Sequence, residues 1–292
     1  MKSPPFDYAR AASIDEACDL LQQHGDAAKL IAGGQSLVPM MAFRLLRPSW
    51  LIDINAIPAL AFVSIEGDAV RMGACARQCG ILRDDVIAAR VPLLRQALGF
   101  VGHAQTRNRG TIGGSLAHAD PSAELPLVAQ VLEALLVLRT ASGPRTLPAS
   151  EFFTGTMTTA LEPDECLVEI HWPIWRDKRI GSAFTEVSRR HGDFAMVAAA
   201  AQVTLDDDER CTHASFGVGG AGSVPVAFPT LAQRLLGERP DEAMLRDIAH
   251  DAAATLEPGS DTHASADYRR HLAGVLIRRV LQSACEVARA TP

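Results

Sequence analysis

Two glycine-rich segments of this 292-residue chain have the residue types of an anion-binding loop. In residues 29–37, an apolar run ends in Gly33 and Gly34, and in residues 103–126, a basic run precedes Gly113 and Gly114. Glycine tolerates positive φ and a close backbone approach, and consecutive N–H groups in such turns bind phosphate oxygens. We therefore predict two phosphate-binding turns, as a dinucleotide with a pyrophosphate would need.

Polar side chains flank both glycine pairs. Gln35 and Ser36 follow the first pair, and Thr111 and Ser115 enclose the second, so each site has a hydroxyl that can donate a hydrogen bond. Taken alone, each glycine pair is also compatible with an ordinary tight turn or helix cap.

In their full contexts, the two segments resemble the FAD-binding medium subunit of the molybdenum hydroxylases, the xanthine dehydrogenase and aerobic carbon monoxide dehydrogenase family. The first resembling motif is Ala-Gly-Gly-Gln-Ser at residues 32–36. The second is Thr-Ile-Gly-Gly-Ser at residues 111–115, followed by Ala-Asp-Pro and an acidic residue before Leu-Pro. Residues 51–55, 189–195 and 265–272 are also similar to the family, so the resemblance extends over essentially the whole chain.

The resemblance implies that the chain binds FAD, without a covalent link, through both glycine segments and a few later positions. The implied contact residues are Lys29, Leu30, Ile31, Ala32, Gly33, Gly34, Gln35, Ser36, Leu37, Thr111, Ile112, Gly113, Gly114, Ser115, Asp120, Glu124, Leu167 and Phe194. No catalytic residue and no metal ligand is expected.

The resemblance implies a specific role for four of these positions, and most of them also have a simpler interpretation. Phe194 would cover one flavin face, or be an ordinary core residue. Glu124 would hydrogen-bond the flavin or ribityl portion, or be a helix-start carboxylate. Lys29 would offset pyrophosphate charge, or simply be solvated, and Leu167 would offer only backbone contact.

The predicted fold class is α+β. A two-subdomain FAD-binding fold is expected over residues 1–176, with a small α/β subdomain at about 1–56 and a larger α+β subdomain at 57–176. A C-terminal α+β domain with a short antiparallel sheet and helices is expected over residues 177–292. Apolar runs predict strands at residues 29–32, 51–54, 62–65, 69–72, 132–139, 166–172, 182–188, 195–205 and 211–218. Helical patterns predict helices at residues 13–24, 37–46, 81–89, 93–101, 231–236, 242–255 and 266–290.

Composition excludes several classes of protein. A formal net charge of -6 disfavours a nucleic-acid-binding surface, which is usually basic. No window approaches the roughly 20 apolar residues of a membrane span, and the N-terminus has no signal-peptide core, so a cytoplasmic location is predicted. The six cysteines are too dispersed for an iron–sulfur cluster or a zinc site and are expected to be reduced and mostly buried.

Two further motifs are weak. Residues 217–222 match G-x-G-x-x-G, but prolines follow where a nicotinamide-dinucleotide site needs a helix, so a strand-end turn is predicted. His118 and Asp120 have no third partner nearby in the sequence and give little indication of a metal.

The resemblance implies an FAD-dependent oxidoreductase subunit that accepts electrons from [2Fe–2S] clusters and passes them to an external acceptor. The implied partners are an iron–sulfur subunit and a molybdopterin-containing large subunit, in a heteromeric complex that is a dimer of heterotrimers. Two alternatives remain open: a self-sufficient flavin-dependent oxidase or dehydrogenase, and a non-enzymatic FAD-binding assembly protein.

Overall fold

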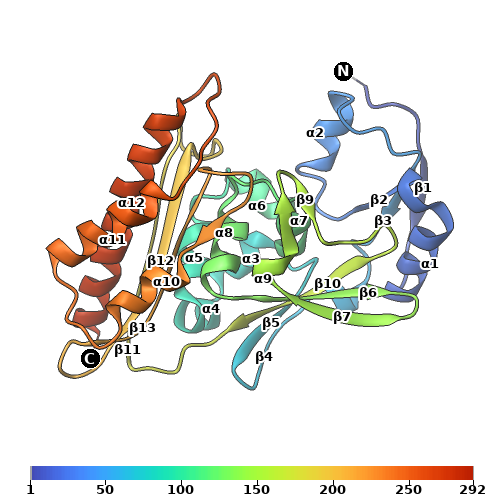
Figure 1. The fold of residues 1–292 in the computed structure, drawn as a ribbon. Coiled ribbons are helices and arrows are strands. Elements are labelled where there is room, and N and C mark those ends of the chain that lie inside the picture. Colours follow the sequence, from blue (N-terminus) through green and yellow to red (C-terminus); the bar gives the residue numbers. More distant parts are fainter. Residues whose placement is uncertain (1, 292) are drawn as a thin grey trace.

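The computed structural model describes residues 2–291, in which three main β-sheets follow one another along the chain (Figure 1). The N-terminal sheet lies at one end of the molecule, a five-stranded sheet in the middle, and a four-stranded sheet with two long helices at the other end. The α+β class predicted from the sequence is confirmed. That residues 1–176 and 177–292 are separate domains stays a prediction.

The N-terminal sheet is parallel, with the order β1 (Asp7–Arg10), β3 (Trp50–Asp53), β2 (Ala28–Ile31). Helix α1 (Ile14–His24) and a 3₁₀ turn at Gly25–Ala27 connect β1 to β2, and α2 (Leu37–Ala42) lies between β2 and β3. A second 3₁₀ turn, Pro58–Leu60, follows the sheet. Because the carboxyl ends of parallel strands meet at one edge, residues 32–36 and Asn55 leave the sheet side by side.

The middle sheet is antiparallel, with the order β4-β5-β10-β6-β7. Its strands are β4 (Val63–Glu66), β5 (Ala69–Gly73), β6 (Leu135–Thr140), β7 (Gly143–Pro148) and β10 (Cys166–Pro173). Six helices lie between β5 and β6: α3 (Gln78–Arg83), α4 (Asp85–Arg90), α5 (Pro92–Leu98), α6 (Ala104–Arg109), α7 (Ile112–His118) and α8 (Glu124–Val131). Between β7 and β10 come α9 (Ala149–Phe152) and the short ribbon of β8 (Phe153–Gly155) and β9 (Thr158–Thr159).

The C-terminal sheet is antiparallel, with the order β11 (Arg179–Val187), β12 (Val197–Leu205), β13 (Cys211–Gly219), β14 (Val226–Ala227). It is followed by α10 (Pro229–Ala232), a 3₁₀ turn at Gln233–Leu235, α11 (Glu242–Ala254) and α12 (Ala266–Ala290). Every residue of β12 is buried. Alternate β12 side chains therefore enter the core shared with α12 on one face and the core shared with α5 and α8 on the other. Figure 1 shows α12 alongside this sheet, with α11 beside α12.

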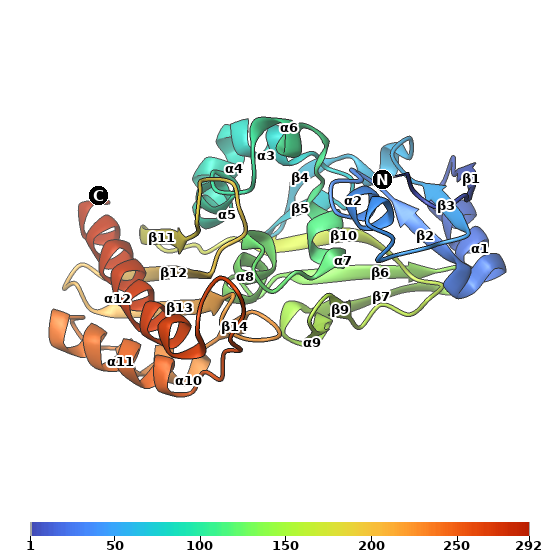
Figure 2. The ribbon, with the colours of Figure 1, turned by 90° about the horizontal axis from the view of Figure 1, so that it is seen from above.

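Three contacts connect the C-terminal sheet to α5, α8 and the segment that follows α5. The rings of Phe100 and Phe184 lie 5.2 Å apart, and Gln96 donates to the hydroxyl of Ser182 at 3.1 Å. Ser215 donates to the last carbonyl of α8, that of Val131, at 2.6 Å. In Figure 2 the helices α3 to α6 gather on one side of the middle sheet, with β11 beside α5.

Most predicted elements are present, and the main errors are shifted element boundaries and the helices α6, α7 and α8, which were not predicted. The helix predicted at residues 81–89 is two helices, because Asp84 has an extended backbone and caps α4 by accepting from the N–H of Val86 at 2.8 Å. The helix predicted to reach residue 46 ends at Ala42, and Arg44 has a φ of 60°. The strand predicted from residue 132 begins only at Leu135.

The cysteines and the glycine-rich turn agree with the predictions. All six cysteines are free and five are buried. Gly217 and Gly219 lie in β13, Gly220 turns the chain with a φ of 74°, and the next helix begins only at Pro229, so residues 217–222 are a strand-end turn. Within residues 2–291, no helix is long and apolar enough to cross a membrane.

Candidate functional site

The two glycine segments meet in space. Gly33 packs so closely on the end of α6 that a Cβ built on it would overlap the carbonyl oxygen of Arg109 and lie 3.0 Å from the Cα of Gly110. Gly110 immediately precedes Thr111, which starts the second motif. The two motifs, which were predicted to bind one dinucleotide, therefore meet through a direct backbone contact.

Residues 33–36 form an open donor loop. Within residues 2–291, the N–H groups of Gly33, Gly34, Gln35 and Ser36 donate to no protein acceptor. The loop turns at Gly34, whose φ is 70°, and the amide of Gln35 donates back to the carbonyl of Gly33 at 3.0 Å. A run of unpaired N–H groups in such a turn is a ready site for phosphate oxygens.

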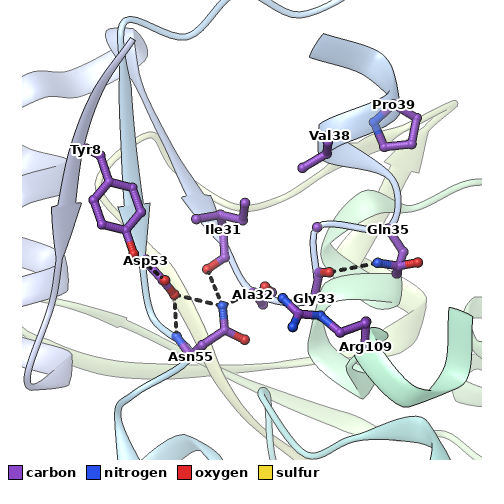
Figure 3. A pocket seen from close by; sticks show the side chains of 11 residues that line it. Tyr8, Ile31, Ala32, Gly33, Gln35, Val38, Pro39, Asp53, Asn55 and Arg109 are labelled. Atoms are coloured by element: carbon purple, nitrogen blue, oxygen red, sulfur yellow. Dashed lines mark hydrogen bonds between the residues drawn. The ribbon is translucent and has the colours of Figure 1, made fainter. Parts of the chain in front are cut away.

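A pocket of about 370 Å³ lies against this loop (Figure 3). Its lining comes from the carboxyl edge of the N-terminal sheet, the start of α2 and the end of α6: Tyr8, Ile31, Ala32, Gly33, Gly34, Gln35, Val38, Pro39, Asp53, Asn55 and Arg109. The guanidinium of Arg109 has no ion pair within the described residues, so the pocket offers one cation beside the unpaired N–H groups.

The floor of the pocket is a fixed polar network (Figure 3). Tyr8 donates to one oxygen of Asp53 at 2.6 Å, and the backbone and amide of Asn55 donate to the other at 2.8 and 2.7 Å. Partial burial opposes ionisation, but these hydrogen bonds hold the pKa of Asp53 below its usual value. The amide of Asn55 also donates to the carbonyl of Ala32 at 2.7 Å, which fixes the start of the loop.

Arg77 connects this network to the second segment. Its guanidinium donates to the side-chain oxygen of Asn55 at 2.6 Å and to the carbonyl of Arg109. Arg77 thus fixes the position of α6 relative to the first loop. Local sequence patterns assign no role to Tyr8, Asn55, Arg77 or Arg109, because their roles depend on contacts between distant segments.

The prediction of a Gly113-Gly114 turn is wrong. Both glycines lie in the first turn of α7, and the hydroxyl of Thr111 caps this helix by accepting from the N–H of Gly114 at 3.1 Å. The N–H groups of Ile112 and Gly113 donate to the carbonyls of Ala76 and Ala74, at 3.0 and 2.9 Å. These donors are already used, so the second motif does not form the predicted nest of free N–H groups.

Gly113 instead serves close packing. A Cβ on this residue would lie 2.5 Å from the Cβ of Ala74, so glycine lets α7 approach the end of β5. Gly114 is exposed and Ser115 is partly exposed, whereas Thr111 and Ile112 are buried. The accessible part of the motif is therefore the Gly114-Ser115 side of α7.

Asp120 and Glu124 are buried near the start of α8, with exposed fractions of 8% and 5%. Asp120 accepts from the N–H of Ser122 at 2.9 Å, so it stabilises the turn before the helix. Glu124 is the first residue of α8, as in its simpler interpretation. The pKa of Glu124 is raised to about 7, mainly by burial; a hydrogen bond from its own backbone N–H lowers the pKa, the charge of Asp120 raises it and that of Arg107 lowers it.

Phe194 is 61% exposed, which rules out the core alternative. It lies in the loop between β11 and β12. This loop contacts the start of α6: a Cβ on Gly192 would lie 2.5 Å from the ring of His103, and the rings of His103 and His191 are 6.3 Å apart. Helix α6 thus extends from this loop to Arg109 at the pocket.

The remaining predicted contacts are more peripheral. Lys29 is exposed, and neither Lys29 nor Leu30 lines the pocket. Leu37 begins α2 directly after the open loop. Leu167 is buried in β10 opposite Leu138, so only its backbone could meet a ligand. No group of three or more His, Cys, Asp or Glu side chains with metal-binding geometry occurs in the described part of the chain.

The first loop fits the pyrophosphate of a dinucleotide. Four successive unpaired N–H groups, the cation of Arg109 and a glycine backbone without Cβ are the features that such a group needs. A six-residue helix such as α6 rises by about 9 Å, so the Phe194 loop lies within reach of the far end of an extended dinucleotide.

Comparison with known proteins agrees with this geometry. Residues 4–175 match the family described as the FAD binding domain in molybdopterin dehydrogenase, and residues 182–284 match the CO dehydrogenase flavoprotein C-terminal domain. The chain is 40% identical over its whole length to the 6-hydroxypseudooxynicotine dehydrogenase complex subunit alpha of Paenarthrobacter nicotinovorans, of which it covers 98%. It is 37% identical to the carbon monoxide dehydrogenase medium chain of Hydrogenophaga pseudoflava, with 97% of this chain and 98% of the relative covered.

Solved structures show the same similarity. A structure of carbon monoxide dehydrogenase from Hydrogenophaga pseudoflava superimposes with a TM-score of 0.95 at 36% identity and covers 98% of this chain and 99% of the other. Quinoline 2-oxidoreductase from Pseudomonas putida 86 gives a TM-score of 0.93 at 37% identity, with 99% of both chains covered. The chain therefore belongs to the FAD-binding medium-subunit family of the molybdenum hydroxylases, and its cofactor is FAD.

Proposed function

We propose that this chain carries FAD as the electron-transfer subunit of a heteromeric molybdenum hydroxylase, taking electrons from [2Fe–2S] clusters of a partner and passing them to an external acceptor. The observation that carries this proposal is the contact of the two glycine segments beside a loop of unpaired N–H groups. When bound, FAD supplies a carrier that exchanges electrons singly or in pairs.

The chain's own residues would position the cofactor. Gly33, Gly34, Gln35 and Ser36 would donate to the pyrophosphate, and Arg109 would neutralise part of its charge. Ala32 and Ile31 line the same pocket and would contact the nucleotide through their backbone. In the second motif, the hydroxyl of Ser115 and the exposed backbone near Gly114 would contact the cofactor, and Thr111, whose hydroxyl caps α7, would position them.

The isoalloxazine ring would lie between the start of α8 and the loop between β11 and β12. Phe194, which is largely exposed, would cover one face of the ring, and Glu124 would face its polar edge or the ribityl chain. Leu167 would contribute only backbone contact. Lys29 acts at most at long range, because it lies outside the pocket lining.

The names of the relatives support a multi-subunit assembly. They are a medium chain and a subunit of a dehydrogenase complex, and the present chain spans nearly their whole length. The proposed partners are an iron–sulfur subunit with [2Fe–2S] clusters and a molybdopterin-containing large subunit, arranged as a dimer of heterotrimers. A cytoplasmic location stays a prediction.

Stopped-flow absorbance of the flavin band tests the proposal. The FAD-loaded chain alone and the complex reconstituted with its iron–sulfur and molybdenum subunits are each mixed with a candidate N-heterocycle, purine or carbon monoxide. We expect bleaching only in the complex. Rapid bleaching of the lone chain would contradict the proposal and indicate a self-sufficient oxidase, and a chain that binds no flavin would indicate an assembly protein.

A further inference from the structure

A buried guanidinium on α12, that of Arg269, connects three separate segments of the chain. Arg269 is only 7% exposed. Its Nη1 atom donates to the carbonyl of Met196 at 2.5 Å and to the carbonyl of Gly220 at 3.0 Å. Its Nη2 atom donates to the carboxylate of Asp261, in the loop before α12, at 2.7 Å. One side chain therefore bridges the residue before β12, the residue after β13 and the loop before its own helix.

Met196 closes the loop that carries Phe194. Its N–H donates to the carbonyl of Val187, the last residue of β11, at 2.8 Å, so the segment between these two residues leaves the sheet as one loop. The carbonyl of Met196 is enclosed from a second side, because a Cβ on Gly220 would lie 2.6 Å from its oxygen. The guanidinium and the backbone of Gly220 together fix a peptide that lies two positions after Phe194.

The second carbonyl that Arg269 binds leads to the start of α8. The N–H of Gly220 donates to the carbonyl of Pro121 at 2.8 Å. Pro121 lies in the turn before α8, three residues ahead of Glu124. Arg269 therefore contacts the loop between β11 and β12 directly and the segment before α8 through Gly220. These are the two segments between which the isoalloxazine ring would lie.

The loop before α12 is organised around the carboxylate that pairs with this cation. Asp261 accepts from the N–H groups of Ala264 and His263, at 2.9 and 2.8 Å. These hydrogen bonds and, after them, the guanidinium of Arg269 lower the pKa of Asp261 to about 2, so it is ionised at neutral pH. The ring of His263 lies 3.2 Å from the guanidinium of Arg189, which belongs to the loop between β11 and β12. The two loops are thus connected twice.

We propose that Arg269 is a positioning residue for the flavin, which fixes the Met196 peptide and, through it, the ring of Phe194. A guanidinium donates in several directions from one rigid plane, and an ammonium on a flexible stem does not. The inference rests on the proposed placement of the isoalloxazine ring beside Phe194. It gives a function to residues 265–272, none of which lines the pocket at the first loop.

Hydrogen exchange of the flavin-free protein, measured on peptides, tests whether Arg269 holds the loop. Arg269→Lys keeps the charge and removes the planar fork. Arg270→Lys is the matched control, because Arg270 is the next residue of α12 and donates instead to Leu256 and Asp267. In Arg269→Lys we expect the loop between β11 and β12 and the turn after β13 to exchange roughly tenfold faster, the scale of one hydrogen bond to a charged group. Exchange in β6 and in the control should match wild type.

Asp261→Asn is a milder second variant, which decides the question if Arg269→Lys does not fold. Asparagine keeps an acceptor for the N–H groups of His263 and Ala264 and removes the charge opposite Arg269. The same loop and turn should exchange faster, by a smaller factor. Wild-type exchange in Asp261→Asn and in any folded Arg269→Lys would overturn the proposal. Faster exchange that includes β6 would show only general destabilisation and would overturn it as well.

Spectra of the FAD-loaded protein test the link to the flavin. Arg269→Lys should change the visible spectrum and fluorescence yield of bound FAD in the same direction as Phe194→Ala, and Arg270→Lys should change neither. In the double variant, Arg269→Lys should retain less than roughly half of its effect, because the ring through which it acts is absent. Additive effects would overturn the link. These spectra require bound FAD and no partner subunit, so the stopped-flow experiment decides the proposed function separately.

Discussion

Gly33 lies against the backbone carbonyl of Arg109, at a separation that leaves no room for a side chain. The two residues are 76 positions apart in the sequence and belong to the two glycine-rich segments. This contact closes the pocket between the N-terminal sheet and α6. A side chain at residue 33 would overlap a backbone carbonyl, which cannot rotate away as a side chain could. One of the two segments would therefore have to move to make room.

Gly33→Ala should therefore reduce FAD affinity at least tenfold, or about 1.4 kcal/mol. The methyl group would push the loop away from α6 and misplace its N–H groups. Gly80→Ala is the matched control, because a Cβ there meets nothing within 4 Å. Flavin fluorescence titration measures both affinities, and equal affinities would contradict a tight fit between the two segments.

Arg77→Lys should weaken FAD binding without unfolding the protein. Lysine cannot donate simultaneously to Asn55 and to the carbonyl of Arg109 as the guanidinium does. Both bonds form without FAD, so their loss lowers affinity only by letting the first loop and α6 move apart, and we expect a loss of about tenfold at most, the size of one net hydrogen bond. Arg83→Lys, on the exposed side of α3, is the control. Isothermal titration with FAD measures the affinity of each variant, and thermal unfolding measures its stability. A loss of affinity at unchanged stability would show that the loop is misplaced and that the protein is not generally destabilised.

Phe194→Ala should leave thermal stability within about 0.5 kcal/mol of wild type, because the ring is 61% exposed. The visible spectrum and the fluorescence yield of bound FAD should change, since we propose that this ring covers one flavin face. Phe6→Ala removes another exposed ring and should leave both signals unchanged. Identical flavin spectra in wild type and Phe194→Ala would move the isoalloxazine site elsewhere.

Stability should fall as pH rises from about 5 to about 8. Burial raises the folded-state pKa of Glu124 to about 7 and that of Glu186 to about 8, above the ordinary value of 4.5. In this window the folded state binds more protons than the unfolded state, so deprotonation favours unfolding. Glu186→Gln removes one of these groups and should flatten the decline, which urea denaturation at a series of pH values measures. A wild-type stability that rises across the window would contradict the burial of both groups.

Several features could be predicted from the sequence because their causes are local. The strands follow short apolar runs, and α12 has the predicted start because Ser265 caps it by accepting from the N–H of Tyr268 at 3.2 Å. The start of α1 likewise has a local cause, because Ser13 caps it by accepting from the N–H of Glu16 at 3.1 Å. Glycine pairs beside hydroxyls indicated the first loop correctly, because Gly34 does require a positive φ.

Other features depend on which segments meet. The same glycine-pair pattern gave an open loop at Gly33 and a helix start at Gly113, because Ala74 and Ala76 supply acceptors only to the second pair. Arg77 and Arg109 carry no local signature, yet each lies beside the first loop once the chain is folded. The sequence by itself therefore determined the family, the cofactor and most secondary structure. Only the tertiary structure decided which N–H groups stay free, since a donor is available to a ligand only where no distant carbonyl has already accepted from it.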